Sequence, residues 1–237
     1  METADNTPGL ASQPPRSDAR ATRIAGRRMR SRLLDGASAL FKERGLSGTT
    51  IADIAVAADA FPSQITYYFH SKEALFVEAA CRDVLYVARD AEIAAAKTTT
   101  PEDYTRALVG SVMGADALPF FVEALTLSRR RPDLVPLIER TMQRLHAEGF
   151  RAYAAEMAKR GWRGGTDPAT TARRFWALAL GVAVEGHAMG RTAEDLSAEL
   201  MLHFGSPAGA AAPGKHLRIA GGTQPANRST PDTENAP

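Results

Sequence analysis

Apolar and polar residues between Thr49 and Leu75 follow the pattern of two short helices, a turn and a third helix. Four apolar residues recur at i, i+3, i+4 and i+7 and so share one helical face: Ile51, Ile54, Ala55 and Ala58. Thr49 or Thr50 can cap this first helix, because a hydroxyl accepts hydrogen bonds from the free N–H groups of a first turn. The pattern therefore predicts a helix that ends before Asp59.

A turn and a shorter helix follow. Asp59 stands where such a turn often needs φ > 0, a conformation that Asp tolerates better than most residues. Pro62 suits the first helical position, because its missing N–H would have had no partner there. We expect a helix over about 62–69, with Ile65 and Phe69 spaced i, i+4 for burial. Ser71 can then cap a third helix.

The outer face of the short helix is polar and aromatic: Ser63, Gln64, Thr66, Tyr67 and Tyr68. Such side chains hydrogen-bond to base edges and phosphates, and a threonine methyl can contact thymine. Two adjacent tyrosines on a helix point about 100° apart, so at least one should face outward. This arrangement predicts a helix-turn-helix whose second helix reads DNA.

The arginines gather just before this segment. Six of them, and no acidic residue, lie between positions 20 and 32, although the net charge is only +2. A disordered, solubilising tail is one interpretation, but a basic segment directly before a helix-turn-helix favours phosphate contact. Lys72 would oppose the dipole at its helix start unless a phosphate lies there. We predict DNA contacts from Arg27, Arg28, Thr49, Thr50, Ser63, Gln64, Thr66, Tyr67, Tyr68 and Lys72.

The stretch from about Arg27 to Val77 resembles the TetR family of bacterial transcriptional repressors. The most specific part of the resemblance is the run of Tyr67, Tyr68, Phe69, Ser71, Lys72, Glu73, Leu75 and Phe76. Three positions depart from the family pattern. Asp59 stands where the family often has Gly, and Phe61 stands where a small residue with a capping hydroxyl is common. Thr66 stands where the first of two tyrosines is frequent. The resemblance implies nine helices, with a DNA-binding head and a body that dimerises and binds a small effector.

Helical periodicity and capping signals continue along the rest of the chain, and no segment shows the period-2 alternation of a strand. We therefore predict an all-α protein. The first helix should begin between Thr22 and Arg28 and end near Arg44, and later helices should cover 72–95, 101–113, 118–128, 133–160, 168–189 and 192–204. The expected divisions are a disordered basic arm (1–24), a helix-turn-helix domain (25–70), an effector-binding and dimerisation domain (71–204) and a disordered tail (205–237).

The segment 175–184 is apolar around nearly its whole circumference, so a helix there must be covered on all sides. One interpretation is a central core helix in a monomer. We favour a homodimer in which this helix and the last one meet their copies as a four-helix bundle. The predicted interface residues are Ala177, Leu180, Gly181, Val184, Leu196, Leu200, Met201 and Phe204.

The resemblance also implies an effector pocket inside the helical body, although each candidate residue could instead be plain core. The candidates, chosen by apolar position and by family, are Tyr104, Met113, Phe120, Phe121, Glu123, Met142, His146, Phe175, Trp176 and His187. A buried His187 or Glu185 would need a partner, either a ligand or the second subunit. No motif names the effector.

Composition narrows the class of protein. The chain has one cysteine, Cys81, so no disulfide can form within it. Neither a signal peptide nor a membrane span is evident in the sequence. We therefore expect a cytoplasmic protein. We find no Gly-rich phosphate loop, zinc-ligand spacing or Gly-x-Ser-x-Gly elbow, and expect neither an enzyme, a cofactor nor a metal site. The sequence predicts a ligand-responsive repressor that binds a pseudo-palindromic operator. The alternatives are an activator and a helical binding protein without operator specificity.

Overall fold

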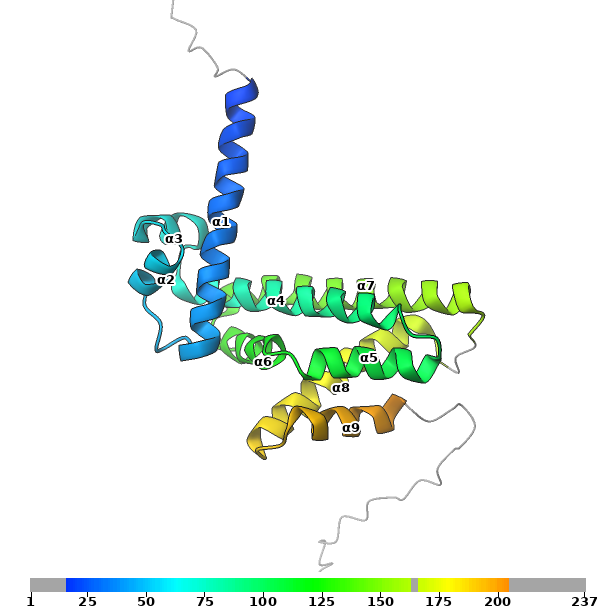
Figure 1. Cartoon of the computed structure of the whole chain (residues 1–237). Coiled ribbons are helices and arrows are strands. Elements are labelled where there is room, and N and C mark those ends of the chain that lie inside the picture. The colour runs from blue at the N-terminus through cyan, green and yellow to red at the C-terminus, as the bar shows by residue number, and fades with distance from the viewer. Residues whose placement is uncertain (1–15, 163–165, 205–237) are drawn as a thin grey trace, which may run out of the picture.

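The computed structural model describes residues 16–162 and 166–204, which hold nine α-helices, one short 3-10 helix and no strand (Figure 1). This confirms the predicted all-α, nine-helix fold. Most of the expected arm and the whole expected tail lie outside the described residues, namely positions 1–15 and 205–237.

Helix α1 spans Arg16–Arg44 and is longer than predicted. It begins before the expected start between Thr22 and Arg28, so residues 16–24 are helical and the prediction of a disordered arm is wrong for them. Alanine and arginine dominate this stretch, and both are strong helix formers, which explains the earlier start. In Figure 1, α1 extends well past the head helices α2 and α3.

The helices of the head begin and end at the predicted local signals. Helix α2 spans Ile51–Ala57, and its cap is Thr50, whose hydroxyl accepts from the Asp53 N–H at 3.1 Å. Asp59 adopts φ 48°, as expected of the turn. Helix α3 spans Pro62–Phe69 with the proline in its first turn, and α4 spans Lys72–Ala95 behind the Ser71 cap.

Five helices complete the body: α5 (Pro101–Met113), α6 (Ala117–Ser128), α7 (Val135–Arg160), α8 (Pro168–Ala188) and α9 (Ala193–Phe204). Their bounds agree with the prediction within about two residues. The exception is a 3-10 helix, Pro132–Leu134, in front of α7, where a continuous helix from Asp133 was expected. Pro136 has no N–H to donate to the Pro132 carbonyl, so a tighter turn forms there.

The core runs without interruption from head to body, because α4 belongs to both. This helix packs against α1 on one side and against α5, α6 and α7 in the body. Phe76 of α4 lies between Phe41 of α1 and Phe120 of α6, with ring centroids 5.0 Å and 4.9 Å apart. Cys81 is buried in the same core, and this burial raises the pKa of its thiol to about 11.

Within the described residues, no single helix is long and apolar enough to cross a membrane, whereas the α5–α6 pair meets the length and composition test together but is bent by 62° at its break.

The aromatic contact between head and body should dominate stability. Phe120→Ala removes a side chain that is only 3% exposed, and we expect the free energy of unfolding to fall by about 3 kcal/mol or more. Urea denaturation followed by circular dichroism measures this. Ile93→Ala on the exposed side of α4 is the control and should cost far less. Equal losses in the two variants would contradict a shared core centred on Phe76.

Candidate nucleic-acid interface and the joint behind it

Helix α3 is held by two buried residues and presents the rest of its surface outward. Ile65 and Phe69 are buried in the core, as predicted from their i, i+4 spacing. Ser63 and Thr66 are exposed, and the side chain of Tyr67 is 76% exposed. The short helix thus contributes two anchors to the core and leaves hydroxyl and aromatic groups free for another molecule.

The two adjacent tyrosines have different surroundings. Tyr68 is half-buried and packed on the core, and its hydroxyl oxygen lies 3.4 Å from where a Cβ on Gly26 of α1 would stand. Tyr67 packs edge-on against the Tyr68 ring, with centroids 5.0 Å apart, and otherwise faces outward. Tyr68 therefore fixes α3 to α1, and Tyr67 is the tyrosine whose hydroxyl can reach a nucleic acid.

One end of the Gln64 side-chain amide is already hydrogen-bonded within the head. Its Oε1 accepts a hydrogen bond from the Phe61 N–H at 2.9 Å, which caps the start of α3 and leaves Nε2 as a free donor group. Phe61 cannot cap the helix with its own side chain, and its ring is 74% exposed beside α3. Phe61 was not among the predicted contacts. One signal could have identified Phe61: it stands at a position where the family pattern often has a small residue with a hydroxyl.

Two residues predicted to contact DNA instead donate hydrogen bonds to backbone carbonyls within the head. Thr49 is fully buried, and its hydroxyl donates to the Gly45 carbonyl at 2.9 Å, so a direct contact from this side chain is ruled out in the structure. Lys72 Nζ donates to the Leu46 and Thr49 carbonyls, both at 2.8 Å, and has one N–H left. Sequence reasoning missed these roles because the acceptors are backbone carbonyls in a loop.

Basic side chains of α1 lie next to this surface. Arg27 and Arg28 are exposed. Arg30 is used internally, since it pairs with Glu78 and lies over the Phe69 ring at 4.9 Å, and Arg32 lies 3.6 Å from the Asp59 carboxylate. The predicted pair, Arg27 and Arg28, is thus exposed and directly follows Gly26, which lies beside Tyr68 of α3.

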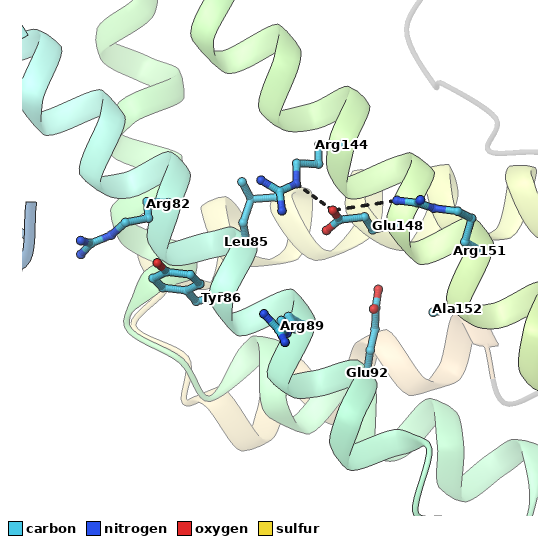
Figure 2. A pocket seen from close by; sticks show the side chains of 9 residues that line it. All are labelled: Arg82, Leu85, Tyr86, Arg89, Glu92, Arg144, Glu148, Arg151 and Ala152. Carbon is cyan, nitrogen blue, oxygen red and sulfur yellow. Dashed lines mark hydrogen bonds and ion pairs between the residues drawn. The ribbon is translucent and has the colours of Figure 1, made fainter. Parts of the chain in front are cut away.

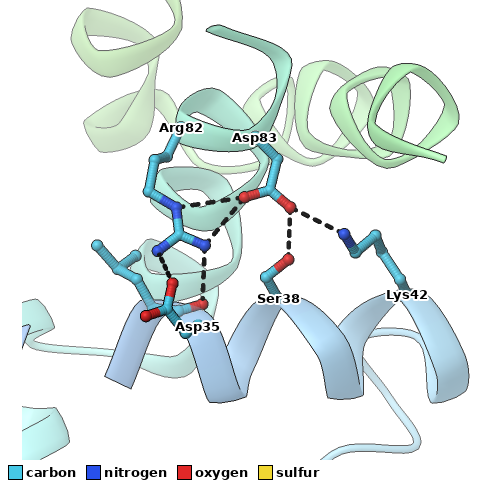
Figure 3. A network of polar contacts seen from close by, with 6 residues as sticks. Asp35, Ser38, Lys42, Arg82 and Asp83 are labelled. Carbon is cyan, nitrogen blue, oxygen red and sulfur yellow. Dashed lines mark hydrogen bonds and ion pairs between the residues drawn. The ribbon is translucent and has the colours of Figure 1, made fainter. Parts of the chain in front are cut away.

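Behind the head, a partly buried polar network joins α1 to α4 (Figure 3). The Asp83 carboxylate of α4 accepts hydrogen bonds from the Ser38 hydroxyl and from Lys42 Nζ, the latter at 3.0 Å. Arg82 donates to Asp83 at 3.0 Å, to the Asp35 carboxylate at 2.7 Å and to the Leu34 carbonyl at 3.4 Å. Two residues of α4 therefore hold four positions of α1.

Most residues predicted to line an effector pocket are packed in the core. Tyr104, Met113, Phe120, Phe121 and Trp176 are buried, while Met142, His146 and Phe175 are half-buried. Burial raises the pKa of Tyr104 to about 12, and its ring contacts those of Tyr153 and Trp162. Glu123 and His187 are exposed in the single chain, as is Glu185, so neither His187 nor Glu185 needs a partner within the chain.

The residues predicted to form the dimer interface divide into two groups. Ala177, Gly181 and Val184 of α8 are exposed, and Leu180 is half-buried. Leu196 and Leu200 of α9 are buried within the chain itself, which corrects their assignment to the interface. Gly186 explains the close contact of the two helices, because a Cβ there would collide with the Leu196 side chain.

The outer surface of α9 is also apolar. Met201 and Phe204 are half-buried, whereas Leu202 is 79% exposed and was not predicted. The helical pattern alone could not decide which side of α9 meets α8, because leucines and methionine occur on both sides.

Two short helices joined by a tight turn, with an outward polar-aromatic surface and a flanking basic helix, define a helix-turn-helix DNA-binding regulator. Two family models match the chain: residues 33–79 match the bacterial regulatory proteins of the tetR family, and residues 101–203 match the bacterial transcriptional repressor C-terminal family. The chain belongs to the TetR family of transcriptional regulators, whose members are not enzymes.

Solved structures agree with this assignment. A protein described as a transcriptional regulator from Rhodococcus sp. RHA1 is 35% identical, with a TM-score of 0.68 over 76% of this chain and 97% of that one. A TetR-family regulator from Mesorhizobium loti shares the fold at 20% identity (TM-score 0.59, 74% and 92% covered). So does a regulator from Saccharomonospora viridis in complex with choline, at 21% identity (TM-score 0.58, 74% and 95% covered). No curated protein matches the chain.

The network at the joint should make stability depend on pH. Burial alone would raise the pKa of Asp83, but hydrogen bonds from Ser38, Lys42 and Arg82 outweigh it and lower the pKa. A carboxylate with a lowered pKa stabilises the fold above its unfolded pKa, and this contribution is lost as pH falls below about 4. We expect Asp83→Asn to be less stable at pH 7 and to lose less stability than the wild type on acidification.

Urea denaturation at pH 7, 5 and 3 measures this difference. Asp90→Asn on the exposed side of α4 is the matched control and should follow the wild-type pH dependence. If Asp83→Asn and the wild type lose stability in parallel as pH falls, the network does not hold the joint in the way described.

Proposed function

We propose that the protein is a repressor that binds a pseudo-palindromic DNA operator as a homodimer and is released by a small-molecule effector. The outward surface of α3 carries this proposal, since the exposed side chains of Ser63, Thr66 and Tyr67 together form a polar and aromatic surface that faces away from the core. The match of residues 101–203 to a repressor C-terminal family favours repression over activation. The proposed setting is the cytoplasm.

The head of about 25–70 would place α3 in the major groove. Base edges are then read by Ser63, Thr66 and the free Nε2 of Gln64, and phosphates are contacted by Tyr67, Arg27 and Arg28. Phe61 joins this surface, where an exposed ring can meet a thymine methyl or a sugar. A helical binding protein without operator specificity would gain nothing from hydroxyl, amide and aromatic groups placed together in this way.

A dimer through α8 and α9 is supported by the unpartnered surface of these helices. Ala177, Gly181 and Val184 recur at i, i+4 and i+7 on the exposed face of α8, and small residues allow a second helix to approach closely. Met201, Leu202 and Phe204 would extend this face over α9. A two-fold axis there would relate the two heads of the dimer. The two α3 helices would then each read one half-site, and the half-sites would lie about 34 Å apart.

The helical body of about 71–204 would hold the effector. One structure of the same fold contains choline, which supports small-molecule binding by such a body. An effector that favours a head separation unlike that of two half-sites lowers DNA affinity by linkage. The N-terminal arm and the C-terminal tail complete the proposed division of the chain.

The exposed hydroxyl of Tyr67 offers a test of DNA contact that leaves the fold intact. After an operator is selected from random duplexes, we expect Tyr67→Phe to weaken binding about tenfold in a shift assay, on operator and random DNA alike, because a phosphate contact carries no sequence information. Thr66→Val should weaken operator binding selectively. Tyr86→Phe on α4 is the control. Unchanged affinity in both α3 variants would contradict the proposed surface.

The dimer is tested at Gly181, where a side chain would meet nothing within 4 Å in the single chain. We expect Gly181→Arg to fold normally and to sediment as a monomer at micromolar concentration, because it separates the two copies of α8. Ala155→Arg, at an exposed position of α7, should remain a dimer. A wild-type protein that is monomeric at this concentration would refute the arrangement.

A further inference from the structure

A charged groove lies on the outside of the body, between α4 and α7 (Figure 2). Its volume is about 620 Å³, which suits a small organic molecule. Arg82 and Arg89 of α4 stand on one wall, and Arg144 and Arg151 of α7 on the other. None of the ten predicted effector residues lines this groove.

The arginines of the groove outnumber its acids. Only two acidic side chains, Glu92 and Glu148, line it against four arginines. Glu148 is shared by two of them, with Arg144 at 2.7 Å and Arg151 at 4.0 Å. Arg89 is exposed and makes no ion pair with the described residues. The groove therefore keeps positive charge that its own acids do not neutralise.

Apolar surface lies beside this charge. The Tyr86 ring is 57% exposed, although a buried position would be the usual one for an aromatic ring on a helix that crosses the body. Leu85 and Ala152 add to the apolar part of the groove. Guanidinium groups bind carboxylates and phosphates through two parallel hydrogen bonds, and an aromatic ring accepts a flat apolar group.

We propose that this groove binds a small organic anion, whose carboxylate or phosphate lies between Arg89 and Arg144 and whose apolar body covers Tyr86. Glu148 pairs with Arg144 beside the proposed anion position, and Glu92 lines the same groove. These two carboxylates would favour a ligand that carries its negative charge at one end only. Such a site differs from an effector pocket inside the helical body in both place and chemistry.

Arg82 connects the groove to the DNA-binding head. Arg82 lines the groove, and its guanidinium donates to Asp35 and to the Leu34 carbonyl of α1 (Figure 3). An anion held by Arg89 and Arg144 would also attract Arg82, which lines the same groove, and would so compete with Asp35 for this side chain and weaken one tie between α4 and α1. Coupling of anion binding to DNA affinity follows by linkage, and this second step rests on the proposed function.

Binding is tested first, without DNA. Benzoate and phenyl phosphate carry the same aromatic body with a carboxylate or a phosphate, and benzamide carries it without charge. Titration calorimetry on the full chain should show binding of at least one of the two anions and none of benzamide. Arg89→Ala should weaken that binding about tenfold or more, because it removes a charge-assisted hydrogen bond.

The control is Arg106→Ala, which removes an exposed arginine of α5 that pairs with Glu102 outside the groove. It should leave the anion affinity unchanged. The difference between the two anions identifies whether carboxylate or phosphate is preferred. Failure of both anions to bind, or equal binding by Arg89→Ala and the wild type, would overturn the proposed site.

Coupling is tested next with Asp35→Asn, a change at a side chain that is 64% exposed. Because Asp35 then no longer competes for Arg82, the anion should bind severalfold more tightly. The same variant should lose most of the effect of the anion on operator affinity in the shift assay. Unchanged anion affinity, or an undiminished effect on DNA, would refute the competition.

The two proposals fail separately. Calorimetry measures the anion site whether or not the chain binds DNA, and the selected operator measures the regulator without any anion. A protein that binds its operator but neither anion retains the proposed function and loses the groove.

Discussion

The contact of Phe76 with Phe41 on one side and Phe120 on the other is the interaction on which the rest of the structure depends. The head has only three helices, two of them short, and cannot enclose a core alone. Helix α4 supplies the missing apolar surface and then continues through the body. A change in the tilt of α4 must therefore move α3, and no hinge of unstructured chain separates the two parts.

The polar network beside these rings gives the joint a defined geometry. Aromatic rings can slide over one another at small cost, whereas the hydrogen bonds of Asp83 and Arg82 are made only at one relative position of α1 and α4. Apolar packing thus supplies the affinity of head for body, and the network selects the orientation. Arg82 is the member of that network that also lines the groove between α4 and α7.

Most of the fold could be predicted from the sequence because local chemistry sets most helix boundaries. A capping threonine at Thr50, a proline at Pro62 and a residue that tolerates φ > 0 at Asp59 are short-range signals, and each acts as predicted. The site was less predictable. Whether Thr49 and Lys72 meet DNA or a carbonyl depends on a loop that folds back from elsewhere in the chain.

The sequence also could not show which apolar residues lie in the core, in a pocket or at an interface. Periodicity shows that α9 has leucines on more than one side, whereas the inward packing of Leu196 against Gly186 depends on a contact between two helices that periodicity does not reveal. The earlier start of α1 has another cause, since a run rich in arginine is compatible with a helix or with a disordered segment.

The buried position of Cys81 has a practical consequence. With a pKa of about 11, its thiol is almost wholly protonated at neutral pH, and the core shields it from reagents. Since the chain has no other cysteine, a thiol introduced on α3 would be the sole reactive one in the native state. A spectroscopic probe could thus be attached to the head without first altering the natural sequence elsewhere, and in the proposed dimer it would report the separation of the two heads.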